Sequence, residues 1–226
     1  MSSFPGISRR GFLGYGAGAA AAAIGAPMLD LLLGREALAA AKPGSGIGYF
    51  ARFGVTDKLI RETLSAALAR GGDFGPEVAE LKRRWSFEAN GVRLHEYYFE
   101  ALKSGQPGLG EGSDLTKDLK RQFGGFASWR KEFAAVGKLR GIGWAVLSCD
   151  PRTGDLVNVW ITSHEDGHPV GFAPLLVLDV WEHAYMVDWA AGGRAEYVDA
   201  FFKNVDWARV ERRHHDALGV ALARHG

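Results

Sequence analysis

The order of helix-forming and strand-forming stretches limits the folds open to this chain of 226 residues more than any other feature. Between Thr56 and Leu139, apolar residues recur at intervals of three and four, the spacing of one face of a helix. From Trp144 to Val180, short runs rich in β-branched and aromatic residues take over, and helical spacing then returns. Helices and strands that are segregated in this way predict an α+β fold rather than a doubly wound sheet.

The first half of the chain is predicted to form a helical hairpin region. We expect a helix over residues 56–70 and further helical stretches over 76–85 and 91–105, where leucines recur one turn apart. Proline at position 76 suits the first turn of a helix. Two shorter helices are expected within residues 114–139, separated by a pair of glycines.

Three strands are expected in the middle of the chain. Residues 144–150 and 156–163 are rich in β-formers, and the turn residues 151–154 between them predict an antiparallel hairpin. Residues 174–180 complete a small three-stranded antiparallel sheet with flanking helices. Residues 181–213 are expected to be helical again, with a break at a Gly-Gly pair.

Charge and cysteine content exclude some classes of protein. The 27 basic and 26 acidic residues nearly balance, so no global field attracts this protein to nucleic acid or anionic lipid, and no nucleic-acid partner is expected. Cys149 is the one cysteine, so no intrachain disulfide can form.

The N-terminal segment resembles a twin-arginine signal peptide. Arg9 and Arg10 come directly before an uncharged run, residues 11–29, that is mostly alanine and glycine, and the small residues of "ALAAA" follow. The alternative is a transmembrane anchor, but an Ala/Gly-rich run is only weakly hydrophobic. We therefore expect export to the periplasm, with cleavage near Ala39 to Ala41 and no membrane attachment afterwards.

The expected organisation has three parts. Residues 1–40 form the signal peptide, residues 41–110 an N-terminal helical domain, and residues 111–226 a C-terminal α/β domain.

Two histidines stand out among the seven of the chain. His95 and His183 lie among aromatic residues, where a histidine is most often a core residue with a hydrogen-bond partner. Three others lie in an arginine-rich stretch near the C-terminus, and we expect them to be solvated: His214, His215 and His225.

Asp179 changes the interpretation of His183. It ends the apolar run "APLLVL", and His183 follows four positions later. A buried carboxylate is costly unless it is compensated, so Asp179 either caps a helix or holds a metal together with His183. Imidazole and carboxylate ligands suit Fe, Mn or Zn.

The sequence around Asp179 and His183 resembles that of a known protein family. "LDVWEHAY" resembles the D-x-W-E-H-A-Y signature of the iron/manganese superoxide dismutases. Four further segments resemble that family in the same order between about residues 50 and 213: "NGVRLHEYYFEAL", "FGGFASWRKEF", "GIGWAVL" and "EYVDAFFKNVDWARVERR".

The resemblance implies a metal site and a reaction. One Fe or Mn ion per subunit would disproportionate superoxide to hydrogen peroxide and oxygen. His95 matches the family's second metal ligand, Asp179 the third and His183 the fourth. The resemblance also implies a homodimer.

It further assigns three residues around the ligands. Glu182 matches an acid that reaches across the dimer to the partner's last ligand. Trp181 and Trp144 match aromatic residues that wall the metal pocket.

The chain departs from the family pattern in its first half. No histidine precedes His95; the family's first ligand falls near Ala67, and the pocket tyrosine falls near Gly75. Met186 replaces an interface tyrosine whose histidine partner is also missing, which predicts a weakened homodimer.

The loop of residues 162–170 offers replacements for some of the missing groups. His164 or His168 is placed to substitute for the missing ligand. Glu165 or His164 corresponds to the family's outer glutamine, and we expect Glu165 to take that place.

Three functions fit these residues. The first is an impaired superoxide dismutase that lacks the first-helix ligand and the pocket tyrosine. The second is a metal-binding protein of other activity, with Zn or non-haem Fe. The third is a non-catalytic exported scaffold. No residue is assigned a catalytic role beyond metal binding.

Overall fold

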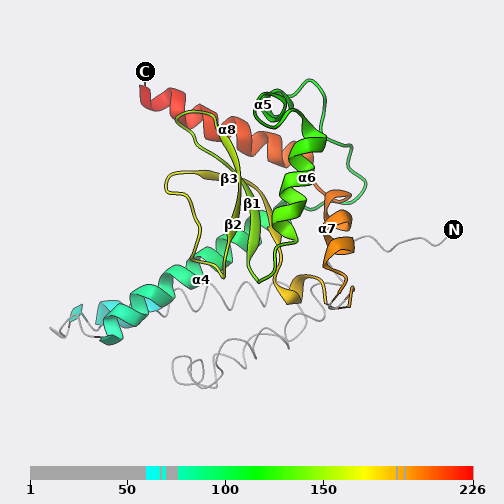
Figure 1. Ribbon diagram of the computed structural model, residues 1–226. Coiled ribbons are helices and arrows are strands. Elements are labelled where there is room, and N and C mark those ends of the chain that lie inside the picture. The colour runs from blue at the N-terminus through cyan, green and yellow to red at the C-terminus, as the bar shows by residue number, and fades with distance from the viewer. Residues whose placement is uncertain (1–59, 67, 70–75, 187, 191, 226) are drawn as a thin grey trace. The chain divides into compact units, whose positions relative to one another are not determined.

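The structure, a computed structural model, describes residues 60–66, 68–69, 76–186, 188–190 and 192–225 (Figure 1). The chain divides into two compact units between Arg93 and Leu94, and each unit is described by itself. The domain boundary that the sequence suggests after residue 110 stays a prediction.

The first unit is helical wherever the structure describes it. Residues 60–66 and 68–69 lie in a helix, within the expected range 56–70, and both ends of that range lie outside the described residues. So do Ala67 and Gly75, the positions of the missing ligand and tyrosine. Helix α4, Pro76–Glu100, joins the next two expected stretches into one helix that enters the second unit at Leu94.

The three expected strands form one antiparallel sheet. Its strands are β1 (Trp144–Cys149), β2 (Leu156–Ile161) and β3 (Ala173–Asp179), in the order β2-β1-β3. The hairpin predicted around residues 151–154 is confirmed, because β1 pairs with β2 from Trp144↔Ile161 to Cys149↔Leu156. Every residue of the central strand β1 is buried, so this strand lies in the core of the unit.

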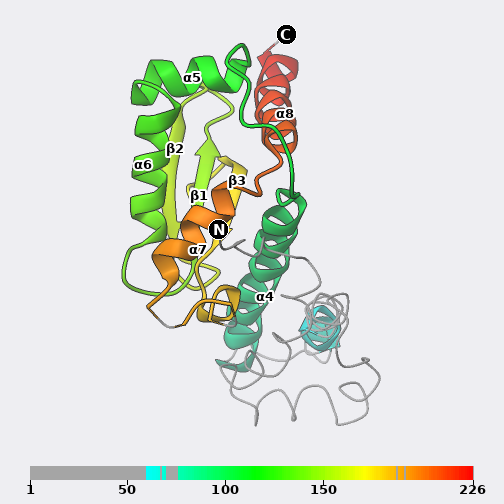
Figure 2. The same cartoon turned by 90° about the vertical axis from the view of Figure 1, so that its right-hand side faces the viewer.

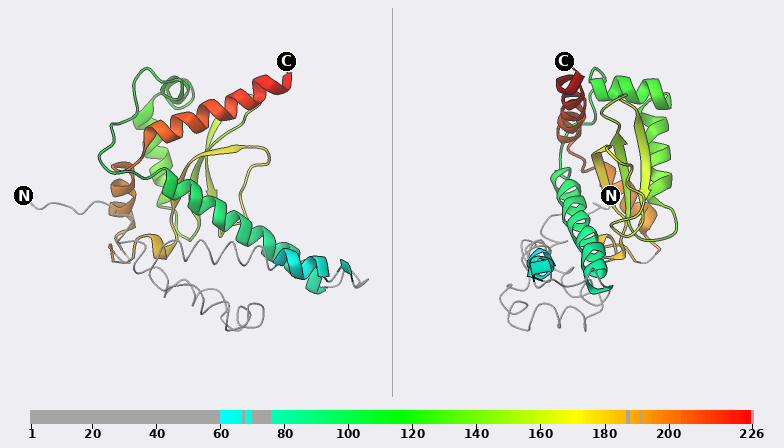
Figure 3. Two further views of the ribbon diagram at one scale, coloured as in Figure 1. Left: turned by 180° about the vertical axis from the view of Figure 1, so that it is seen from behind. Right: turned by 90° about the vertical axis from the view of Figure 1, so that its left-hand side faces the viewer.

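Helices cover both faces of this sheet. Helix α6 (Phe126–Gly137) packs against β1 and β2, and α8 (Trp207–His225) packs against β3 on the opposite face (Figures 2 and 3). The other two helices of this unit are α5 (Asp114–Phe123) and α7 (Arg194–Phe202). Gly137 allows α6 to lie close to β3, since a Cβ atom there would lie 2.9 Å from Cδ2 of Leu178.

The segment after β3 differs from the expectation. Helix was expected to resume at residue 181, but the described residues of this segment form only the 3₁₀ turn η1 (Glu182–Ala184) before regular helix begins at Arg194. Hydrogen bonds explain the difference. The Val180 N–H donates to the carbonyl of Gly143, and the Trp181 N–H donates to Oδ1 of Asp179, so the chain is held at the end of the sheet.

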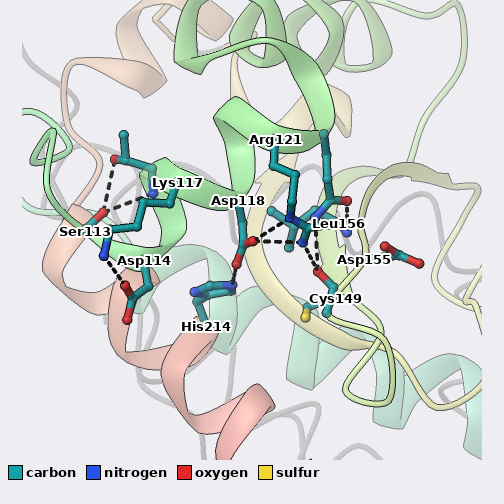
Figure 4. Close-up of polar contacts among 12 residues, drawn as sticks. Ser113, Asp114, Lys117, Asp118, Arg121, Cys149, Asp155, Leu156 and His214 are labelled. Atoms are coloured by element: carbon teal, nitrogen blue, oxygen red, sulfur yellow. Dashed lines mark hydrogen bonds and ion pairs between the residues drawn. The ribbon is translucent and has the colours of Figure 1, made fainter.

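The expectation for His214 was wrong. Its side chain is only 2% exposed, and Nε2 lies 3.2 Å from Oδ2 of Asp118, between α8 and α5 (Figure 4). Its neighbour His215 is exposed, as expected, because it lies on the outer face of α8. The side chain of His225 lies outside the described residues.

Among the described residues, we find no helix that combines the length and the apolar character needed to cross a membrane.

Candidate metal centre

Three separate elements bring the candidate ligands to one end of the sheet. Asp179 is the last residue of β3 and pairs with Trp144, the first residue of β1. His95 comes from the last turns of α4, and His183 from η1 directly after the strand. Side chains alternate along a strand, so Leu178 contacts the α6 side near Gly137 while Asp179 points to the opposite face, toward His95.

The donor atoms of these three residues form a small triangle. Nε2 of His183 lies 3.1 Å from Oδ2 of Asp179, Nε2 of His95 lies 3.5 Å from the same oxygen, and the two nitrogens are 3.5 Å apart. A point equidistant from three atoms with these separations lies about 2.0 Å from each, within the usual range of metal–nitrogen and metal–oxygen bonds. Within the described residues, this is the one group of three or more such side chains that could hold a metal ion.

The two oxygens of Asp179 have different partners. Oδ1 accepts the backbone N–H of Trp181 at 2.9 Å, and Oδ2 faces both histidines. The two interpretations of Asp179 are therefore compatible, because one oxygen caps the turn while the other joins the donor triangle. A carboxylate fixed in this way cannot rotate away from the site.

Burial and charge oppose one another at this centre. His95 and Asp179 are fully buried, and His183 is 13% exposed. Burial alone would raise the pKa of Asp179, but His183, His95 and the Trp181 N–H outweigh it and lower that pKa. Burial alone would lower the pKa of His183, but Asp179 raises it above its ordinary value. The carboxylate is therefore held in its charged form, which is the form that binds a cation.

Aromatic rings enclose the donor triangle. Trp144 meets His95 edge to face, with ring centroids 4.7 Å apart, and Trp181 stacks near His183 at 6.0 Å. His164 lies between the two tryptophans: its Nδ1 accepts the Trp144 Nε1–H at 3.0 Å, and its ring lies 4.8 Å from that of Trp181. Such a wall limits the access of water to the donors.

The loop that carries His164 needs unusual backbone geometry. Ser163 directly before it has φ 56°, which few residues other than glycine adopt. Gly167 has φ 101°, and a Cβ atom there would lie 2.5 Å from the carbonyl oxygen of Trp160. This turn directs His164 inward, where it is buried.

The expected replacement ligands do not join the triangle. His164 lies beside it, with its ring centroid 6.0 Å from that of His95, but its Nδ1 is bonded to Trp144. Nε2 of His168 is 2.9 Å from the carbonyl oxygen of His164, so His168 secures the loop instead. His164 is buried and Glu165 is partly exposed, and the assignment of the outer position to Glu165 stays a prediction.

Sequence reasoning missed a pair of buried tyrosines behind the site. The Tyr197 hydroxyl donates to the carbonyl of Asp179 at 2.7 Å, and the Tyr98 hydroxyl lies 3.1 Å from that of Tyr197. Burial raises the pKa of both phenols, so they remain protonated. Tyr98 follows His95 by three positions, which is a detectable signal, but nothing near Tyr197 in the sequence indicates its contact with Asp179.

Comparison with known proteins identifies the family of this chain. The family profile described as iron/manganese superoxide dismutases, C-terminal domain, matches residues 111–213. An iron superoxide dismutase of Aquifex aeolicus is 35% identical over 172 residues, which cover 76% of this chain and 79% of that enzyme. This chain belongs to the iron/manganese superoxide dismutase family.

Two further relatives represent both metal types. The iron superoxide dismutase of Cupriavidus metallidurans is 41% identical over 136 residues, 59% of this chain and 66% of that enzyme. This chain thus spans slightly less than two thirds of the Cupriavidus enzyme. The manganese superoxide dismutase of Haloarcula marismortui is 34% identical over 147 residues, 65% of this chain and 70% of that enzyme.

The donor set fits the metals of this family. Two imidazole nitrogens and one carboxylate oxygen suit divalent and trivalent iron and manganese, and they also suit zinc. The fixed Oδ1 of Asp179 and the buried His95 provide the orientation that a metal site requires.

Proposed function

We propose that this protein binds one Fe or Mn ion through His95, Asp179 and His183 and disproportionates superoxide to hydrogen peroxide and oxygen. The observation that carries this proposal is the donor triangle, whose three atoms lie within bonding reach of one point. The names of the relatives support the same reaction.

An Fe or Mn ion held by His95, Asp179 and His183 would supply the redox chemistry of the reaction. The residues of the chain set the conditions for that chemistry. Asp179 contributes a negative charge whose direction is fixed by the Trp181 N–H. His183 is the partly exposed ligand, so a small anion approaches on its side, and the rings of Trp144 and Trp181 limit the access of water.

Proton supply is the step in which we expect impairment. Peroxide formation consumes two protons, and the pocket tyrosine implied by the family has no counterpart near Gly75. Because the Trp144 N–H occupies Nδ1 of His164, neutral His164 carries its proton on Nε2. General acid assistance typically contributes roughly 10²–10⁴-fold, so its reduction gives a slow dismutase rather than an inactive one.

Two features of the whole protein are part of the proposal. We propose periplasmic location through the twin-arginine pathway, supported by Arg9 and Arg10 before an uncharged run. We also propose a homodimer that is weaker than is usual in the family, since Met186 stands in place of an interface tyrosine.

A second function is favoured by the ligand set itself. Two histidines and one carboxylate are also the ligands of oxygen-activating non-haem iron sites and of some zinc enzymes. In that case the protein binds metal but does not disproportionate superoxide.

Metal analysis and a dismutation assay separate these functions. The full chain is purified from the periplasm, its Fe, Mn and Zn contents are measured, and dismutation is assayed before and after loading with Fe or Mn. Slow dismutation that is lost in His183→Ala supports the proposal. Stoichiometric Zn, or Fe without dismutation, supports the second function, and protein that takes up no metal is a scaffold.

A further inference from the structure

Two buried phenols connect the elements that carry His95 and Asp179. The Tyr197 hydroxyl, on α7, lies 2.7 Å from the backbone carbonyl oxygen of Asp179. The Tyr98 hydroxyl, on α4 one helical turn after His95, lies 3.1 Å from that of Tyr197. Both tyrosines are at most 1% exposed within a single chain, so a partner subunit would not change their surroundings.

The protons of these two hydroxyls have one consistent arrangement. A carbonyl oxygen accepts and cannot donate, so the short contact with Asp179 uses the single proton of Tyr197. The proton between the two phenol oxygens therefore belongs to Tyr98, which donates to Tyr197. The result is a directed chain of hydrogen bonds from α4 through α7 to the end of β3, in which each bond strengthens the next.

The aromatic rings are held by packing as well as by these hydrogen bonds. The Tyr98 ring stacks on that of Phe201 at an interplanar angle of 8°, with centroids 6.1 Å apart. The Tyr197 ring stacks on that of Tyr185 at 5.7 Å. Phenylalanine at position 98 or 197 would keep these ring contacts and remove only the hydroxyl, so the chain can be broken with little change in packing.

We propose that Tyr197 and Tyr98 are positioning residues of the metal centre, which fix Asp179 relative to His95 before an ion binds. The Trp181 N–H holds Oδ1 of Asp179, but that bond lies within one turn and fixes nothing relative to α4. The phenol chain does span the two elements. Neither tyrosine is a candidate ligand, so both act through Asp179, and the inference rests on the metal binding in the proposed function.

The first experiment measures the Mn²⁺ affinity of the full chain by competition titration. Tyr197→Phe should lower this affinity about tenfold, at the lower end of the roughly 10–100-fold loss typical of groups that orient a ligand. Tyr98→Phe should lower it by less, because Tyr197 still donates to Asp179. Since the two residues act in series, the double variant should lose no more affinity than Tyr197→Phe alone.

Trp129→Phe is the matched control. It removes a buried hydrogen bond too, the one from the indole N–H to Oδ1 of Asn158, but on the α6 side of the sheet. This variant should lower the free energy of unfolding and leave the Mn²⁺ affinity unchanged.

The second experiment needs no metal. The backbone N–H of Trp181 donates to Oδ1 of Asp179, so its exchange with deuterium reports on how firmly that side chain is held. In metal-free Tyr197→Phe this N–H should exchange faster than the loss of global stability explains. In Trp129→Phe the two should agree.

Three results would overturn the inference: unchanged Mn²⁺ affinity in Tyr197→Phe, additive losses in the double variant, or unchanged exchange of the Trp181 N–H. If the unaltered protein takes up no metal, the proposed function fails, and the exchange experiment alone decides whether the phenols fix Asp179. If it takes up metal and both tyrosine variants match it, the proposed function stands and the positioning role is rejected.

Discussion

Asp179 shows, at the scale of one residue, how a buried strand can end in a charged side chain. Its Oδ2 attracts two histidines, its Oδ1 caps a turn, and its backbone carbonyl accepts the Tyr197 hydroxyl. Burial of an unpaired carboxylate would cost several kcal/mol, so each of these contacts offsets part of that cost.

Replacing Asp179 by asparagine removes the negative charge of the side chain while nearly preserving its shape, so this variant tests the charge alone. The Asn side chain keeps an oxygen for the Trp181 N–H but loses the negative charge between the histidines. Loss of a group that merely supports a ligand costs metal affinity about 10–100-fold, so we expect Asp179→Asn to lose at least that much. Metal competition titration measures the change.

Asp199→Asn is the matched control, because that carboxylate is exposed on α7. It should bind metal like the unaltered protein. Equal affinity in Asp179→Asn and Asp199→Asn would remove Asp179 from the ligand set.

At the scale of elements, the contact between α5 and α8 depends on pH. Burial lowers the pKa of His214 below its ordinary value of 6.5, although Asp118 and Asp114 on α5 act in the opposite direction and His215 lowers it further. Nε2 lies 3.2 Å from Oδ2 of Asp118, with which it forms an ion pair when His214 is protonated (Figure 4). The unfolded chain therefore binds this proton more readily than the folded one does.

The sign of the pH dependence follows from that difference. The contribution of neutral His214 to the free energy of unfolding is fully present above about pH 6.5. It is lost as the pH falls toward the lowered pKa, by at most about 1.4 kcal/mol per pH unit. Urea unfolding between pH 7.5 and 5 should show this loss, and His214→Gln should reduce the slope. His215→Gln, at an exposed position, should change the slope much less, because His215 makes the smallest of the contributions to the pKa of His214.

Packing between α6, β3 and α7 gives a second prediction at this scale. Gly137→Ala would place a Cβ atom 2.9 Å from Leu178 Cδ2 and 3.5 Å from Val198 Cγ2, both in the core. Overpacking of about 1–3 kcal/mol should exceed the gain of roughly 1 kcal/mol in helix propensity, so the free energy of unfolding falls.

Gly219→Ala in α8 is its counterpart, since a Cβ atom there meets nothing within 4 Å. This variant should be stabilised by a few tenths to about 1 kcal/mol, because only the propensity changes. Thermal or urea unfolding of both variants provides the test, and the opposite order of stabilities would contradict the packing described for α6.

Elements were predictable from sequence where the pattern is local. The β1–β2 hairpin could be predicted from β-branched residues on both sides of a turn that contains proline and glycine. The three ligands could be predicted from the sequence motif around Asp179 together with the family resemblance. The inward position of His164 depends on the φ of 56° at Ser163, and the burial of His214 depends on α5, about a hundred positions earlier. Neither is encoded by neighbouring residues, so neither could be predicted.

At the scale of the whole molecule, location can be tested through Arg9 and Arg10. If the N-terminal segment is a twin-arginine signal, replacing both residues by lysine should leave the protein uncleaved in the cytoplasm, although charge is conserved. Cell fractionation and N-terminal sequencing measure this, and cleavage of the unaltered protein should fall near Ala39 to Ala41.

Arg35→Lys, outside the arginine pair, should be exported normally. Export of the double variant at the normal rate would mean that another route carries the protein, or that the segment is not such a signal.

The spacing of the ligands also determines when the site can first exist. His95 and His183 are 88 positions apart, and Asp179 lies just before the second of them. A growing chain on the ribosome therefore carries one donor from residue 95 to residue 178 and then gains the other two nearly together. A chain that has not yet reached His183 cannot offer the triangle, so capture of the ion belongs to the last part of synthesis or to the time after it.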